Sequence, residues 1–182
     1  MPIYISLLRG INVGAYKRIK MEHLRTSFEK LGFEQVKTYI QSGNVIFKTT
    51  KLPPQLLSDR IEKRLLTDFG FPISVVSRTV DEMAKVVEGN PFLNKRDINQ
   101  DKFHIMFLTD APTAAALKNL AALTAAPDQS RCVGKEIYLY LPNGTAGSSL
   151  MKSQLDRVLF VVTTTRNWRT VNTLHQMSQE CR

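Results

Sequence analysis

The feature that most constrains this fold is an order of strand-like and helix-like segments that occurs twice along the chain. In both halves, short apolar runs rich in β-branched residues alternate with stretches whose apolar residues recur every three or four positions. The first pattern is typical of strands and the second of helices. Each half reads strand, helix, strand, strand, helix, strand, with one extra helix at its end. The period of about 90 residues indicates an internal duplication.

The elements can be placed along the sequence. The expected strands are Ile3–Leu8, 36–40, 45–47, 72–76, Phe103–Leu108, 131–133, 137–141 and 161–165. The expected helices are 21–31, 53–70, a helix around 83–87, 112–123, 150–160 and 168–178. The strand and helix order of each half is that of the ferredoxin-like, split βαβ motif, in which both helices cover one face of a four-stranded antiparallel sheet.

The sequence therefore predicts an α+β protein made of two tandem ferredoxin-like units, each with an extra C-terminal helix. We place the domains at residues 1–90 and 91–182, joined by a linker over 89–101 that reads GNPFLNKRDINQD.

Charge is the clearest compositional signal of function. The net charge is +9, and residues 1–78 hold 13 Lys and Arg against 6 Asp and Glu. A basic field of this kind attracts phosphates, nucleotides, nucleic acid or acidic metabolites. The alternative is that the charge serves only solubility.

Other compositional features narrow the protein class. We find no apolar stretch long enough for a membrane span and no secretory leader pattern. The two cysteines, Cys132 and Cys181, have no metal-ligand spacing, which favours reduced thiols. We expect a cytoplasmic protein without membrane association, bound metal or cofactor.

The first candidate site follows from the expected topology. The loop after the first strand and the turn between the second and third strands should meet at one end of the sheet. They bring together polar and glycine residues: Arg9, Gly10, Asn12, Gly14, Lys17, Arg18, Lys20, Gln41, Ser42, Gly43 and Asn44. Glycines let backbone N–H groups turn toward a bound oxygen, and the following helix begins nearby with its positive dipole end. This arrangement predicts a small anionic ligand of the phosphate or nucleotide type. It is neither a P-loop nor a dinucleotide fingerprint, and an ordinary solvated loop remains the alternative.

A second candidate region lies near the C-terminus. Arg166, Asn167 and Trp168 should lie close to the loop PNGTAGSS. An arginine beside a tryptophan can hold a planar anion, or can simply anchor the last helix. In that loop, Ser148 or Ser149 is expected to cap the next helix.

Two other functions stay open. The basic first half could bind RNA through its surface, with Tyr4 and Tyr39 on an open sheet face, although the third strand lacks the aromatic pattern of RNA-recognition motifs. The protein could also be an enzyme acting on a phosphorylated or acidic substrate, for which we identify no catalytic residue. His23, His104 and His175 have no evident carboxylate partner and are expected to be ordinary surface or core histidines.

Four stretches, SLLRGINVG, KRIKMEHLRTSFEKLGF, VKTYIQSGNVIF and TTRNWRTVNTL, together resemble the bacterial family catalogued as domain of unknown function 1697. The resemblance covers nearly the whole chain. It implies two decorated ferredoxin-like units and no biochemical activity. Of the fourteen candidate residues named above, all except Lys17 and Arg18 match the family's motif positions, and Met21 matches as well. Ala15 departs from a glycine that is common there.

Overall fold

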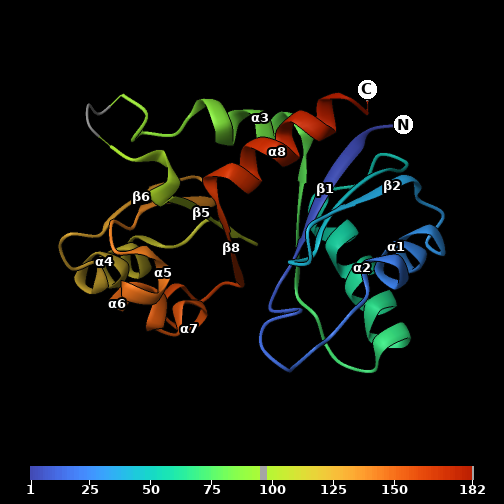
Figure 1. The fold of residues 1–182 in the computed structure, drawn as a ribbon, viewed down its shortest axis with the longest axis horizontal. Helices are drawn as coiled ribbons and strands as arrows, with labels where there is room; N and C mark the ends of the chain where they lie inside the picture. Colours follow the sequence, from blue (N-terminus) through green and yellow to red (C-terminus); the bar gives the residue numbers. More distant parts are fainter. Residues whose placement is uncertain (95–97, 182) are drawn as a thin grey trace. The chain divides into compact units, whose positions relative to one another are not determined.

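The computed structural model describes residues 1–94 and 98–181, and it has an α+β fold with two four-stranded antiparallel sheets (Figure 1). The chain divides into two compact units, residues 1–85 with 173–182 and residues 86–172. Part of the expected linker, residues 95–97, lies outside the described residues. The proposed domain boundary near residue 90 stays a prediction.

The first unit contains one sheet with two helices packed on it. In chain order the elements are β1 (Ile3–Leu8), α1 (Met21–Glu29), β2 (Glu34–Tyr39), β3 (Asn44–Lys48), α2 (Pro54–Phe69), β4 (Val75–Thr79) and the first part of α3 (Val80–Glu88). The strand order is β2-β3-β1-β4. Because α1 and α2 lie side by side on one face (Figure 1), their apolar stripes and that face of the sheet enclose a core that includes Phe28, Phe33 and Phe47.

The second unit repeats the sheet but not every helix. Its elements are η1 (Gln100–Lys102), β5 (Phe103–Leu108), α4 (Ala114–Leu123), β6 (Gln129–Val133), β7 (Glu136–Tyr140), α5 (Gly144–Gly147), α6 (Ser149–Lys152), α7 (Leu155–Leu159), β8 (Thr163–Asn167) and the start of α8 (Trp168–Gln179). The strand order is β6-β7-β5-β8.

Several expectations about elements were wrong. The segment PNGTAGSS, expected to be a loop, contains the short helix α5. The helix expected at 150–160 is divided, because the chain leaves helical geometry at Ser153 (ψ 154°) and α7 begins only at Leu155. The last strand of each sheet begins later than the apolar run that we took for it, at Val75 rather than 72 and at Thr163 rather than 161.

The polar continuation of these last strands has a physical reason. In β4, Ser77 lies opposite Ser6 of β1, and its hydroxyl is hydrogen bonded to the hydroxyls of Ser6 (2.8 Å) and Ser58 (2.9 Å). Arg78 lies opposite Ile5, and Arg166 holds the corresponding place opposite Ile105. Both arginines are buried. A hydrophobic pattern alone could not reveal strands whose buried residues are polar.

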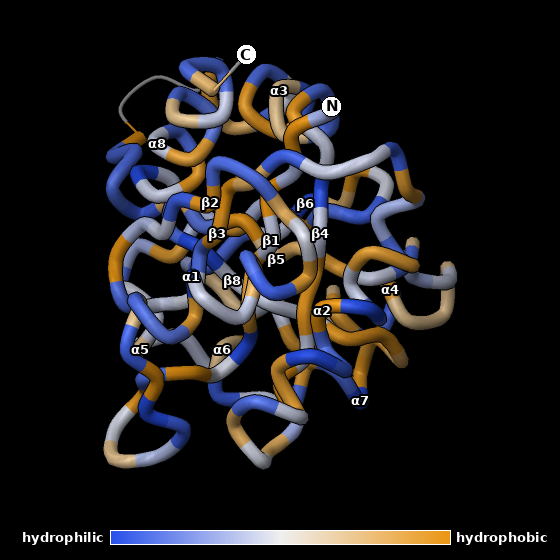
Figure 2. Tube along the Cα trace, turned by 90° about the vertical axis from the view of Figure 1, so that its right-hand side faces the viewer, coloured by the Kyte–Doolittle hydropathy of each residue, from blue (hydrophilic) through white to orange (hydrophobic). Residues whose placement is uncertain are grey.

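Hydrophobic residues occur in short stretches throughout the trace, as Figure 2 shows. Among the described helices, none combines the length and the apolar character that crossing a bilayer requires.

Candidate functional site

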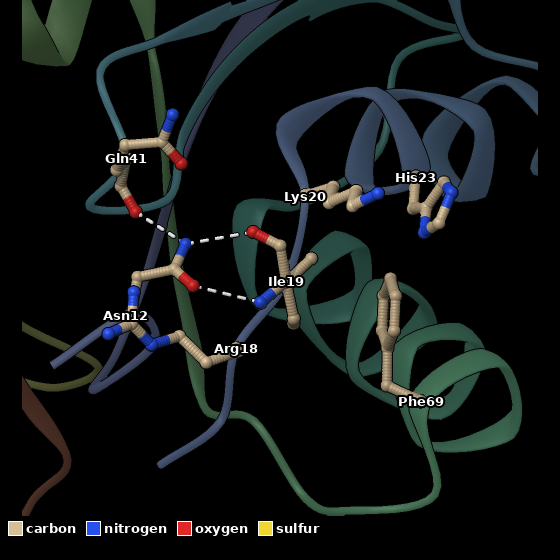
Figure 3. Close-up of a pocket in the computed structure, with 7 residues that line it drawn as sticks. All are labelled: Asn12, Arg18, Ile19, Lys20, His23, Gln41 and Phe69. Carbon is tan, nitrogen blue, oxygen red and sulfur yellow. Dashed lines mark hydrogen bonds between the residues drawn. The ribbon is translucent and has the colours of Figure 1, made fainter. Parts of the chain in front are cut away.

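Asn12 joins the loop after β1 to the turn between β2 and β3. Its side-chain amide donates to the carbonyl oxygens of Ile19 (2.9 Å) and Gln41 (2.8 Å), and its Oδ1 accepts the backbone N–H of Ile19 at 2.8 Å (Figure 3). The backbone N–H of Asn12 also donates to the carbonyl of Lys17. These bonds confirm that the loop and the turn lie side by side, and they make Asn12 a residue that shapes the site.

The turn at residues 41–44 is built around Gly43 and Asn44. Gly43 has φ +78°, and a Cβ there would lie 2.7 Å from the Cβ of Leu8. Its carbonyl accepts the backbone N–H of Leu8 at 2.8 Å. The Asn44 side chain is buried and donates to the carbonyl of Tyr39 and the hydroxyl of Ser42. A glycine is needed at position 43 because the turn approaches Leu8, at the end of β1, too closely for a side chain.

A pocket of about 480 Å³ opens beside this junction (Figure 3). Its lining comes from the loop, the turn and both helices: Asn12, Arg18, Ile19, Lys20, His23, Gln41 and Phe69. Ligand pockets typically have volumes of about 300–1,000 Å³. The size and the mixed polar and apolar lining suit a small molecule.

The cations that line the pocket are Arg18 and Lys20. Both side chains are exposed, and neither makes a hydrogen bond or salt bridge to any residue that the structure describes. Lys20 is also the N-cap of α1, and within the described chain no side chain caps this helix. Figure 3 shows Lys20 extending toward His23 and Arg18 extending toward Asn12, so the two cations stand on different sides of the pocket. The uncapped start of α1 lies at Lys20, and its N–H groups favour an anion there.

Lys17 is different from its two neighbours. Its ammonium donates to the carbonyl of Pro72 at 2.9 Å and lies 5.8 Å from the centre of the Phe71 ring. Lys17 therefore ties the loop to the segment before β4.

Among the predicted ligand residues, Asn12, Lys20 and Gln41 line the pocket, whereas the others in this unit do not: Arg9, Gly10, Gly14, Ser42, Gly43 and Asn44. The backbone N–H of Arg9 donates to the carbonyl of Ser74, and partial burial lowers the pKa of its guanidinium. A ligand role for Arg9 stays a prediction.

His23 and Phe69 are pocket residues that sequence reasoning missed. His23 was expected to be an ordinary histidine, yet its position in the first turn of α1 puts it at the pocket. Phe69 is the last residue of α2. The helix ends there because Gly70 takes the left-handed conformation (φ +76°), and its N–H donates to the carbonyl of Leu66. The expected topology could have indicated Phe69. In the βαββαβ order the two helices run antiparallel on one face of the sheet, so the end of the second helix lies beside the start of the first.

The three predicted residues of the second unit are held by structural contacts. The Asn167 Oδ1 accepts the N–H of Thr170 at 2.8 Å and so caps α8. Trp168 is buried with its ring perpendicular to that of Phe103. Arg166 donates to the hydroxyl of Thr164 and the carbonyl of Thr165, and burial lowers its pKa to about 10, which leaves it charged at neutral pH.

Two smaller expectations were also resolved. Ser148 caps α6 by accepting the N–H of Met151, as expected, and donates to Asp128 at 2.6 Å. Tyr4 does not lie on an open sheet face. It is buried in the helix-side core, stacked on Phe47, and its hydroxyl donates to the carbonyl of Leu52. Tyr4 is therefore not placed to stack on an RNA base.

Comparison with known proteins supports the fold. The chain is similar to a solved structure, the conserved bacterial protein SP0830 from Streptococcus pneumoniae, with a TM-score of 0.77 and 23% sequence identity. The match covers 97% of this chain and 98% of that one. At this identity the likeness shows the fold alone. No curated protein matches the chain. The family described as "Protein of unknown function (DUF1697)" matches residues 1–138, and the chain therefore belongs to the DUF1697 family.

Proposed function

We propose that the first unit binds a small anionic ligand, of the phosphate or nucleotide type, in the pocket between the loop after β1 and the first turn of α1. The observation that carries this proposal is the pair of exposed cations, Arg18 and Lys20, which line one pocket and have no partner in the described part of the chain. Cations with no protein partner are ready to pair with a ligand.

The chemistry of the pocket favours phosphate over a simple carboxylate. Arginine offers a planar fork of N–H donors, which matches two oxygens of a phosphate, and lysine adds a point charge. The uncapped start of α1 provides further N–H donors. A phosphate has three terminal oxygens to share among these groups, while a carboxylate has two.

The proposal can be tested by calorimetric titration with inorganic phosphate and ribose 5-phosphate at low salt. Arg18→Ala and Lys20→Ala should each lower the affinity roughly 10- to 150-fold, which corresponds to the 1.5–3 kcal/mol of a hydrogen bond to a charged group. Lys51→Ala is the matched control. It removes an exposed cation that follows Lys48, and Lys48 lies opposite Ile3 at the other end of β1.

Two results would reject the proposal. Either no phosphate compound binds the wild-type protein, or the two pocket variants bind as well as Lys51→Ala. A third result would favour the nucleic-acid alternative instead: binding of long single strands whose affinity falls steeply with salt and drops equally in all three lysine and arginine variants. That pattern would indicate a basic surface rather than a pocket.

We also propose that the two units are ferredoxin-like duplicates. The corresponding strand orders β2-β3-β1-β4 and β6-β7-β5-β8 support this. A matching pair of backbone bonds supports it as well: Leu8 N–H donates to Gly43 at 2.8 Å, and Leu108 N–H donates to Lys135 at 2.9 Å.

A further inference from the structure

We infer that the ligand of this pocket is a nucleoside monophosphate, in which an aromatic base is joined to the phosphate. This inference rests on the proposed anion site and concerns the aromatic residue that lines the same pocket. Phe69 lines the same pocket as Arg18 and Lys20. In Figure 3 its ring points from the end of α2 toward Lys20 and His23. The pocket therefore has an aromatic side as well as a cationic side.

Phe69 is held in place from behind. It is half-buried, packs against the core cluster that contains Ile19, and lies 6.4 Å from the ring of Phe71. Because Gly70 ends α2 directly after it, the backbone at Phe69 is fixed as well. A ring that is already ordered loses little conformational freedom when a flat partner stacks on it.

The combination of walls selects among phosphate compounds. A sugar phosphate would satisfy Arg18 and Lys20 but would leave the apolar lining from Ile19 and Phe69 without an apolar partner. A nucleoside monophosphate supplies both parts, since every base has a π-face that can stack on an aromatic ring. The ring of His23, in the first turn of α1, is a second flat group beside the same space.

The experiment compares ligands that share the phosphate and differ in the base. Ribose 5-phosphate, adenosine 5′-monophosphate and uridine 5′-monophosphate are titrated into the wild-type protein, Phe69→Ala and Phe69→Leu. The wild type should prefer the nucleotides over ribose 5-phosphate by roughly 5- to 150-fold, the range that stacking of one base on an aromatic ring contributes. Both variants should lose this preference and keep the affinity for ribose 5-phosphate.

Phe69→Leu keeps an apolar side chain in the core, so it separates lost stacking from lost folding, and Phe69→Tyr should bind as the wild type does. The inference is overturned if the wild type binds ribose 5-phosphate as tightly as the nucleotides, or if the preference survives in Phe69→Leu. In both cases the anion site stands. Failure of every phosphate compound to bind would instead remove the proposed function, and this inference with it.

Discussion

In each unit the loop after the first strand and the turn between the second and third strands meet at one end of the sheet, but the caps and side-chain contacts at these two ends differ. In the first unit, loop 9–20 leads into α1, which has no side-chain cap, and Arg18 and Lys20 are left unpaired among the described residues. In the second unit, a short connection leads into α4, which Thr113 caps by accepting the N–H of Ala116 at 3.2 Å.

The turns at these ends differ in the same sense. Lys135 of the β6–β7 turn donates to the carbonyl of Thr109 at 3.1 Å and lies 3.7 Å from the Asp110 carboxylate. In the second unit Lys135 and the start of α4 thus have partners within the unit. In the first unit, within the described chain, Lys17 is paired but Arg18 and Lys20 are not, and no side chain caps the start of α1. This difference fits the proposal that the first end binds a ligand, and the variants below test that proposal.

The largest effect is expected at the closest backbone approach. Gly43→Ala places a Cβ 2.7 Å from that of Leu8 at φ +78°. We expect the free energy of unfolding to fall by about 2–4 kcal/mol, from left-handed strain and overpacking together. Gly134→Ala in the corresponding turn meets nothing closer than 4.0 Å and should cost only the strain, about 1–2 kcal/mol. Urea unfolding measures the loss of stability in both variants. Equal losses for Gly43→Ala and Gly134→Ala would contradict the claim that the first turn is the more closely packed one.

Asn12→Ala should have the next largest effect, because it removes three side-chain hydrogen bonds. We expect a loss of about 1–3 kcal/mol in the free energy of unfolding and weaker phosphate binding, since the carbonyls of Ile19 and Gln41 lose their donors. Asn12→Asp keeps an acceptor for the N–H of Ile19 but turns a carboxylate oxygen toward the carbonyl oxygens of Ile19 and Gln41, so it should lose at least as much stability as Asn12→Ala, and its negative charge should weaken phosphate binding further. A variant Asn12→Ala with unchanged stability and affinity would show that the loop does not depend on this side chain.

Exchanging the helix caps should separate stability from binding. Lys20→Ser gives α1 a capping hydroxyl and should raise the free energy of unfolding by about 0.5–1 kcal/mol while it weakens phosphate binding. Thr113→Ala removes the cap of α4 and should lower the free energy of unfolding by about 1 kcal/mol with no change in binding. Denaturant unfolding and calorimetry on the same samples check both. If Lys20→Ser bound phosphate normally, Lys20 would not be a ligand residue.

Much of this architecture could be read from the sequence because it depends on local patterns. A short apolar run placed β1, helical patterns placed α1 and α8, and the strand directions of the βαββαβ motif placed loop 9–20 beside turn 41–44. Glycines and asparagines with a backbone role were also visible, although residues such as Gly43 and Asn44 prove to shape the turn rather than to line the pocket.

The remaining parts depend on contacts that are distant in sequence. Phe69 reaches the pocket only because α2 packs beside α1, and no local pattern marks it. Arg78 and Arg166 continue strands as buried charges, which a rule based on apolar runs excludes. Whether a cation is paired, as Lys17 is by Pro72, or unpaired, as Lys20 is among the described residues, is decided by the folded chain and not by the residue type.

The smallest effect on stability is expected for the ion pair between Lys135 and Asp110 in the second unit. The Lys135 and Asp110 side chains are 48% and 70% exposed, so solvent weakens their attraction across 3.7 Å. Lys135→Ala should change the free energy of unfolding by less than about 1 kcal/mol and leave phosphate binding at the first unit unchanged. Lys135→Met, which keeps the length of the side chain, separates the charge from the packing. A loss of phosphate binding in either variant would mean that this end also attracts the ligand, and the contrast between the two units would no longer support a single site.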